Sequence, residues 1–398
     1  GIGFTDTNVK VGNTALDSQT TGTDNTAVGD KALTANTTGY RNTAIGFEAL
    51  TANTTGEEGT AVGRYALKTN TTGNQNTAVG RNALKDNTTG AQNTAVGVNA
   101  LEGNTTASNN TAIGYFALDA NTTGTQNVAV GAYAMDASST ANYNTAVGYQ
   151  ALTANTTGDE HVAIGNEALA TNTTGTQNTA VGYRALKANN GSSNTAVGES
   201  AMVSNTTGNN NVAIGRDCLD ANTTGTGNVA IGVAALGANT TANYNTAIGL
   251  DVLQTNTTGT LNTAVGRNTL NANTTGNNNV AIGAMALDAN TTGSQLVAVG
   301  YGALSANTTA DSNVAVGDNT LNDNTTGTAN TAIGRSALAS NTTADGNTAV
   351  GRSAMVSNTT GPSNTAVGAY TLDANTTGQY NTACGWGAMG ENTTGIEN

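Results

Sequence analysis

The sequence predicts an all-β fold, a β-solenoid or β-roll in which short coils stack on one another. Three observations predict it: a pentapeptide close to Asn-Thr-Ala-Val-Gly recurs every 17 residues, glycine and leucine hold fixed places in that period, and the composition is poor in large side chains. Only 4% of the residues are aromatic and 10% are charged, so an ordinary globular core and a highly charged disordered chain are both disfavoured. An internal repeat is the simplest organisation that orders such a chain.

The repeat can be followed almost to the last residue. Units begin at Asn8 and then every 17 residues up to Asn178; one step of 16 residues leads to Asn194, and the 17-residue spacing resumes to Asn398. The chain thus contains a lead-in segment, residues 1–7, and a continuous array of 23 units, residues 8–398, whose short unit spans residues 178–193. In that unit the sequence Asn-Asn-Gly-Ser-Ser, residues 189–193, replaces Asn-Thr-Thr-Gly and two variable residues, so the deletion falls in a turn.

Four columns of the repeat are nearly invariant. The fifth position is glycine and the ninth is leucine or methionine in every unit, whereas the third is alanine except at Lys10 and the fourth is valine or isoleucine except at Cys384. The consensus N-T-A-V-G-x-x-A-L-x-A-N-T-T-G-x-x predicts two short strands per coil, NTAVG and xxALxA, closed by a turn at NTTG. Recurring Gly and Asn favour turns and disfavour helix.

One unit cannot fold alone. It buries about one Val and one Leu, worth roughly 3–6 kcal/mol at about 1.5–3 kcal/mol per side chain, whereas ordering 17 residues costs about 1–2 kcal/mol each in backbone entropy. Stacked coils share hydrogen bonds and ladders of like side chains. Alternation along NTAVG places Val with Thr on one face and Ala with Gly on the other, and this thin core favours a homotrimeric fibre, with an end-to-end filament as the alternative.

The motif NTAVG-x-x-AL-x-x-NTTG resembles the repeats of tail-fibre and adhesin-like proteins, many of which end in an endosialidase-type chaperone domain. The opening Gly1-Ile2-Gly3 is similar to the lead-in of such proteins. A looser similarity links N-T-A-V-G-x-x-A to the shorter N-S-x-A-I-G-x-x-S head repeats of trimeric autotransporter adhesins, which form trimeric left-handed β-rolls. The resemblance implies a structural fibre with an extracellular or surface-exposed location, on a cell or a virion.

The sequence offers little to catalysis, so we expect no enzyme, no catalytic residue, no metal site and no cofactor. The single histidine, His161, replaces the first Asn of a unit and has no reserved acid or nucleophile partner. Six aspartates share the tenth position, but other residues interrupt the column: Asp17, Asp119, Asp136, Asp220, Asp288 and Asp373. Cys218 and Cys384 are expected to be free, buried thiols.

Charge and hydropathy exclude other partner classes. The net charge is −13 and the 13 Lys and Arg residues are scattered, so no basic stripe predicts nucleic-acid binding. No apolar stretch approaches the ~20 residues of a membrane span.

The Asn-Thr-Thr triplets are formal N-glycosylation acceptors, for example at Asn36, Asn53, Asn70 and Asn87. The alternative, which we favour, is a ladder of stacked asparagine amides that bond from coil to coil.

Contact surface is expected where the repeat varies, at the two positions after the invariant glycine. Aromatic and arginine side chains gather there: Arg64, Arg81, Tyr115, Phe116, Tyr133, Tyr149, Tyr183, Tyr301, Tyr370 and Trp386. Such a surface serves either an interface between chains or a cell-surface or glycan receptor. We therefore predict the shaft of an extracellular fibre that spaces or presents binding surfaces. The alternative is a lateral-face binding module for ice or carbohydrate.

Overall fold

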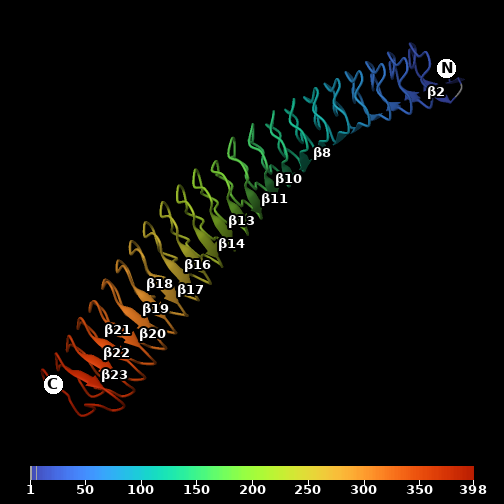
Figure 1. Cartoon of the computed structure of the whole chain (residues 1–398). Coiled ribbons are helices and arrows are strands. Elements are labelled where there is room, and N and C mark those ends of the chain that lie inside the picture. The colour runs from blue at the N-terminus through green and yellow to red at the C-terminus, as the bar shows by residue number, and fades with distance from the viewer. Residues whose placement is uncertain (1, 6) are drawn as a thin grey trace. The chain divides into compact units, whose positions relative to one another are not determined.

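The computed structural model describes residues 2–5 and 7–398, and the chain falls into two compact units, Gly1–Asn194 and Thr195–Asn398. Each unit is a parallel β-solenoid whose coils correspond to the 17-residue repeat, and the described residues contain no helix. Figure 1 shows the pattern: each coil contributes one short strand and returns through irregular chain to the next strand. The predicted all-β solenoid is confirmed.

The strands of the first unit are β1 (Ile2–Thr5), β2 (Asn8–Val11), β3 (Thr26–Val28), β4 (Thr43–Ile45), β5 (Thr60–Val62), β6 (Thr77–Val79), β7 (Thr94–Val96), β8 (Thr111–Ile113), β9 (Val128–Val130), β10 (Thr145–Val147), β11 (Val162–Ile164) and β12 (Thr179–Val181). Those of the second unit are β13 (Thr195–Val197), β14 (Val212–Ile214), β15 (Val229–Ile231), β16 (Thr246–Ile248), β17 (Thr263–Val265), β18 (Val280–Ile282), β19 (Val297–Val299), β20 (Val314–Val316), β21 (Thr331–Ile333), β22 (Thr348–Val350), β23 (Thr365–Val367) and β24 (Thr382–Cys384).

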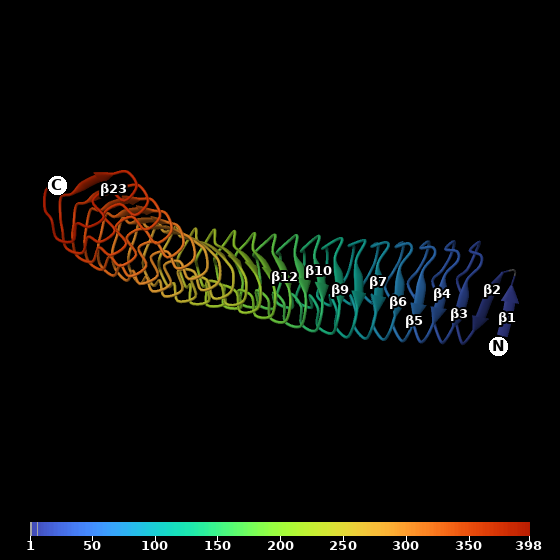
Figure 2. The same cartoon turned by 90° about the horizontal axis from the view of Figure 1, so that it is seen from below.

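Within each unit the coil strands pair in parallel and in register. Between β3 and β4, for example, Thr26 lies opposite Thr43 and Ala27 opposite Ala44. Like residues therefore form continuous columns, as the repeat predicts. The lead-in differs, because β1 runs antiparallel to β2, with Ile2 opposite Val11, and occupies the other edge of β2 (Figure 2). Gly1 and Asp6 of the lead-in lie outside the described residues.

The prediction of two strands per coil is wrong, because xxALxA does not form a strand. In the coil that begins at Asn25, Lys31 at the seventh position and Leu33 at the ninth have φ values of 58° and 51°, in the left-handed region. These residues interrupt the pleat. The segment still bonds to both neighbouring coils: the Leu33 N–H donates to the Ala49 carbonyl at 3.0 Å and the Lys31 N–H to the Asn13 carbonyl at 3.1 Å.

This backbone also explains why the ninth position is only Leu or Met. Leu or Met stands there at positive φ in every coil, from Leu16 to Met389. A β-branched Val or Ile would be severely strained at such φ values, whereas unbranched Cβ atoms are tolerated.

The fifth position requires glycine because its φ is positive and because the next coil leaves no room for a Cβ atom. Gly29 has φ 137°, which side chains rarely adopt, and a Cβ there would lie 2.4 Å from the Gly46 carbonyl oxygen of the next coil. The same close approach recurs from coil to coil. Any side chain would push two coils apart.

The core of each coil is small and partly polar. In the coil that begins at Asn25, the fully buried side chains belong to Ala27, Ala32 and Leu33, together with Asn25 and Asn36. The predicted alternation along the strand is confirmed, but the alanine face is the interior and the Thr and Val side chains point outward. Valine therefore does not join the coil core as expected. For the same reason Cys384, at the valine position, is exposed, whereas Cys218 is buried.

The interior asparagines form two ladders, which confirms the predicted amide stacking. The Asn53 Nδ2 donates to Asn36 Oδ1 of the preceding coil and to the Gly56 carbonyl of its own coil, both at 2.9 Å. At the start of the repeat, Asn42 Nδ2 donates to the same Gly56 carbonyl at 2.9 Å. Its Oδ1 accepts the backbone N–H of the next coil, at Gly59. The buried amides of Asn42 and Asn53 are thus paired, as their burial requires.

The 16-residue coil replaces its missing backbone carbonyl with a side chain. In a regular coil the N–H groups of Thr37, Thr38 and Gly39 all point at the Thr54 carbonyl of the next coil. The corresponding N–H groups of Thr173, Thr174 and Gly175 instead donate to Asn190 Oδ1, at 3.1, 3.0 and 3.2 Å. The deletion is therefore absorbed in the turn, as predicted, because one side-chain amide occupies the place of a peptide group.

Candidate interaction surfaces

The outward face of each sheet is uncharged along its length and combines Thr with Val and Ile side chains. The second position of the described strands is Thr or Val and the fourth is Val or Ile, except Cys384. These side chains point away from the core: Ile45 and Ile282 expose 40% and 42% of their surface. We call these two columns the sheet face. Apolar side chains repeated along an accessible column are typical of interaction surfaces. The sequence placed Val and Thr on one face of the strand but did not show that this face points outward.

The variable dipeptide lies on the corner that follows each strand, and its two members obey different constraints. The sixth position holds charged, polar, aromatic and aliphatic side chains, including the β-branched Val98 and Val233. The seventh position adopts positive φ, as at Tyr65 (64°) and Phe116 (54°), and Thr14 is its one β-branched residue. Variation at the seventh position is thus limited by backbone conformation.

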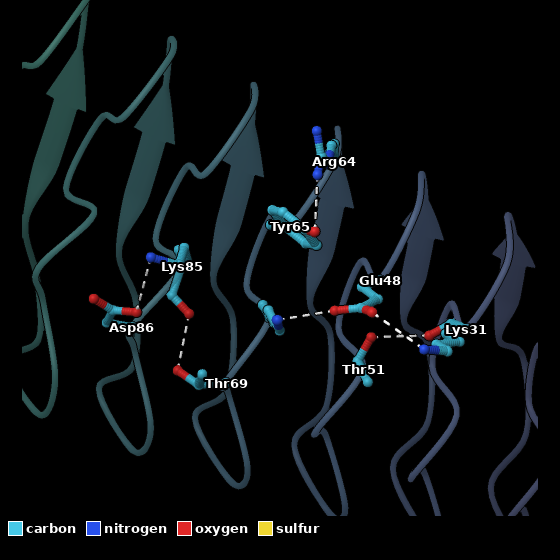
Figure 3. A network of polar contacts seen from close by, with 9 residues as sticks. Lys31, Glu48, Thr51, Arg64, Tyr65, Thr69, Lys85 and Asp86 are labelled. Carbon is cyan, nitrogen blue, oxygen red and sulfur yellow. Dashed lines mark hydrogen bonds and ion pairs between the residues drawn. The ribbon is translucent and has the colours of Figure 1, made fainter.

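Arg64 belongs to a group that we call the cationic cluster: Lys31, Phe47, Glu48, Arg64, Tyr65 and Lys68. Figure 3 shows Lys31, Glu48, Arg64 and Tyr65 of this cluster, which come from three successive coils. Glu48 accepts Lys68 Nζ at 2.9 Å and Lys31 Nζ at 3.4 Å, and the Arg64 guanidinium lies over the Tyr65 ring, 4.5 Å from its centre. Lys68 lies 4.6 Å from the centre of the same ring. Hydrogen bonding to Lys68 lowers the pKa of the Glu48 carboxyl.

Four of the predicted contact residues form a second group, the aromatic patch: Tyr115, Phe116, Tyr133 and Tyr149. The Tyr115 and Phe116 rings meet edge to face at 4.5 Å, Phe116 stacks on Tyr133 at 5.9 Å, and Tyr133 meets Tyr149 at 6.2 Å. Tyr115 and Tyr149 are exposed. Residues from three successive coils thus create one continuous aromatic surface.

An acidic column runs beside the aromatic patch. It consists of Glu102, Asp119 and Asp136, which hold the tenth position of three successive coils. Burial raises the pKa of Asp119 to about 6, and repulsion from the carboxylates of Glu102, Asp136 and Asp86 contributes. The charge of Lys85 lowers this pKa by a smaller amount. Glu102 is bonded to Lys85 at 2.8 Å and Asp136 to the Thr153 hydroxyl. The sequence showed these acidic residues but not that the tenth position approaches the ring of the seventh, as Lys68 does at Tyr65.

The remaining predicted contact residues do not join either group. Arg81 and Tyr301 are exposed singly, and the Arg184 guanidinium lies over the Tyr183 ring at 4.8 Å. Tyr370 and Trp386 meet edge to face at 6.2 Å and line a shallow hollow of about 780 Å³. The ten predicted residues therefore form separate local surfaces.

The structure is incompatible with glycans on the four predicted acceptors. Asn36, Asn53, Asn70 and Asn87 are at most 1% exposed, and their amide nitrogens donate within the ladder. A sugar on Nδ2 would remove these bonds and displace the neighbouring coil. In the folded chain these four amides are therefore buried and paired, and the triplets serve the turn, which is the interpretation that we favoured.

His161 takes the place of an inner asparagine. Its Nε2 lies 2.7 Å from the Gly175 carbonyl, and its Nδ1 accepts the Asn178 N–H at 3.2 Å, so the bonds fix the Nε2–H tautomer. Burial lowers the pKa of His161. Burial also raises the pKa of the Cys218 thiol to about 12, which makes it unreactive. Neither residue has the surroundings of a catalytic group.

Within residues 2–5 and 7–398, no group of three or more His, Cys, Asp or Glu side chains is arranged to hold a metal ion. The same residues include no helix long and apolar enough to cross a membrane. No known protein-family model matches the chain, and a search among curated proteins gives no significant match.

Proposed function

We propose that the chain is the shaft of an extracellular fibre, in which three copies associate through the sheet face and the variable corners remain available to a cell-surface or glycan receptor. The observation that carries the proposal is the uncharged column of Val and Ile at the fourth position of each unit's coils, whose side chains are exposed or half-buried and never buried. Hydrophobic burial is worth about 25 cal/mol per Å², so a column that continues over many coils supplies a strong drive for association. A trimer of parallel chains buries this column in register.

The oligomeric state tests the proposal. Analytical ultracentrifugation of the 39.3 kDa chain should give the mass of three copies. The triple variant Ile45→Lys, Val62→Lys, Val79→Lys places three charges on the sheet face and should shift the mass toward one copy while circular dichroism stays unchanged.

A matched control places the same charges on the exposed turn, with Thr55→Lys, Thr72→Lys and Thr89→Lys. This control should remain trimeric. A wild-type chain that sediments as a monomer, or a control that dissociates as readily as the face variant, would contradict the trimer. Protease treatment of intact cells or virions tests the location, since a surface fibre should be accessible.

One observation favours ice binding as a second candidate. The Thr side chains of the second position point outward and stand in register, as Thr26, Thr43 and Thr60 do. Such a regular array of hydroxyl and methyl groups is also suited to an ordered water lattice, although Val replaces Thr in several coils. Both candidates use the sheet face, so a monomer that shapes ice crystals would replace the fibre proposal by this one.

A further inference from the structure

The aromatic patch lacks the Lys and Arg side chains that lie over the rings of the cationic cluster. In the cationic cluster the tenth position is Lys68, which lies over the Tyr65 ring and bonds to Glu48. In the patch the same position holds Asp119 and Asp136. Among the described residues no Lys or Arg lies over the rings of Tyr115, Phe116, Tyr133 or Tyr149. The two surfaces have equivalent positions in the repeat, but only one has its own cations.

The rings and the carboxylates of the patch form one surface. In the cationic cluster the Nζ of Lys68, at the tenth position, lies 4.6 Å from the centre of the Tyr65 ring, at the seventh position of the same coil. Asp119 and Asp136 hold the same tenth position in the coils of Phe116 and Tyr133. The Asp136 carboxylate also contributes, after burial and Tyr115, to the raised pKa of Tyr133. Glu102, Asp136 and Asp86 repel the Asp119 carboxylate, and the one cation that acts on it among the described residues, Lys85, is already bonded to Glu102. Negative charge therefore remains uncompensated next to exposed aromatic faces.

We propose that the aromatic patch and its acidic column bind the guanidinium groups of an arginine-rich segment of a partner polypeptide. A planar guanidinium stacks on aromatic faces and forms two parallel bonds with a carboxylate, which a compact ammonium does not. The chain itself contains the pattern, since Arg64 stacks on Tyr65 in the cationic cluster. The successive coils offer a row of carboxylates to side chains of an extended peptide. This activity goes beyond the fibre proposal and does not depend on trimer formation.

The test uses the full chain and a labelled peptide in which three arginines alternate with glycines, followed by fluorescence anisotropy at physiological ionic strength. The control peptide carries citrulline in place of arginine, which keeps the shape and removes the charge. We expect at least a tenfold preference for the arginine peptide. Equal binding of the two peptides would overturn the proposal.

Two pairs of variants localise the site. Asp119→Asn should weaken binding about tenfold, whereas Asp288→Asn changes the net charge equally, at the same repeat position in a coil that contains no aromatic residue, and should have little effect. The double variant Phe116→Leu, Tyr133→Leu should weaken binding similarly, and Tyr183→Leu, Tyr301→Leu should not. Equal losses within either pair would show general attraction to an acidic surface and would overturn the assignment. Unchanged circular dichroism confirms that the variants fold.

Discussion

Regular coils and coils in which another residue replaces a ladder asparagine differ in how they pair their buried hydrogen-bonding groups. In a regular coil the Asn53 amide is paired on both sides: its Nδ2 donates to Asn36 Oδ1 of the preceding coil, and its Oδ1 accepts Asn70 Nδ2 of the next. Where Ser138 replaces the asparagine, its hydroxyl and Asn121 Oδ1 are both buried without a partner. His161 and Asn190 also depart from the pattern, yet each places a donor or an acceptor where the repeat needs one. The interior therefore selects hydrogen-bond geometry and not asparagine as such.

The largest expected effect is the loss of an amide from an intact ladder. Asn53→Ala removes three hydrogen bonds and leaves Asn36 Oδ1 buried without a donor. We expect a destabilisation of about 2–4 kcal/mol, since each buried unpaired group costs about 1–3 kcal/mol. Hydrogen exchange of the neighbouring coils measures it, because coils of a repeat protein open locally. The exposed Thr55→Ala is the control; an equal effect there would show that the ladder is not what matters.

The next effect concerns the short coil. Asn190→Ala deprives the N–H groups of Thr173, Thr174 and Gly175 of their common acceptor. A loss of about 1–3 kcal/mol is expected, reduced by water because the turn is exposed. Asn190→Asp keeps an acceptor oxygen and should retain most of the stability. Hydrogen exchange in residues 173–193 reports the change, and identical behaviour of the two variants would contradict the proposed role of Oδ1.

Repair of an interrupted coil gives a smaller effect of opposite sign. Ser138→Asn restores a donor to Asn121 Oδ1 and an acceptor for Asn155 Nδ2, so we expect a gain of about 1 kcal/mol. Thermal denaturation and local hydrogen exchange measure it. A neutral or destabilising result would mean that the surrounding backbone has adapted to serine.

The smallest effect at neutral pH belongs to His161. Burial lowers the pKa of His161 in the folded chain below the value of 6.5 for a free histidine. Its contribution to the free energy of unfolding is therefore fully present above pH 6.5 and is lost as the pH falls below that value. Protonation of Nδ1 would also point two N–H groups at each other at Asn178. His161→Asn should remove this part of the pH dependence. Comparison with wild type isolates it from Asp119, whose raised pKa acts in the opposite direction.

Columns of like residues were predictable because a strict period brings residues 17 apart into register. The sequence therefore predicted the solenoid, the amide ladders and the turn that absorbs the deletion. The second strand was not predictable by the same argument, because the pattern around Leu33 does not distinguish an extended backbone from a left-handed one. The absence of Val and Ile from the ninth position was the available signal.

What the sequence by itself determined about this protein is its period, its register and the small side chains of its interior, because these follow from which residues recur. The tertiary structure alone decided which face of the strand is the interior, since closure of the coil around Ala27 and Leu33 turns Val28 outward. It also decided that the tenth position approaches the seventh, as Lys68 does at the Tyr65 ring, because the coil path, and not the period, brings the tenth position back to the corner that follows the strand.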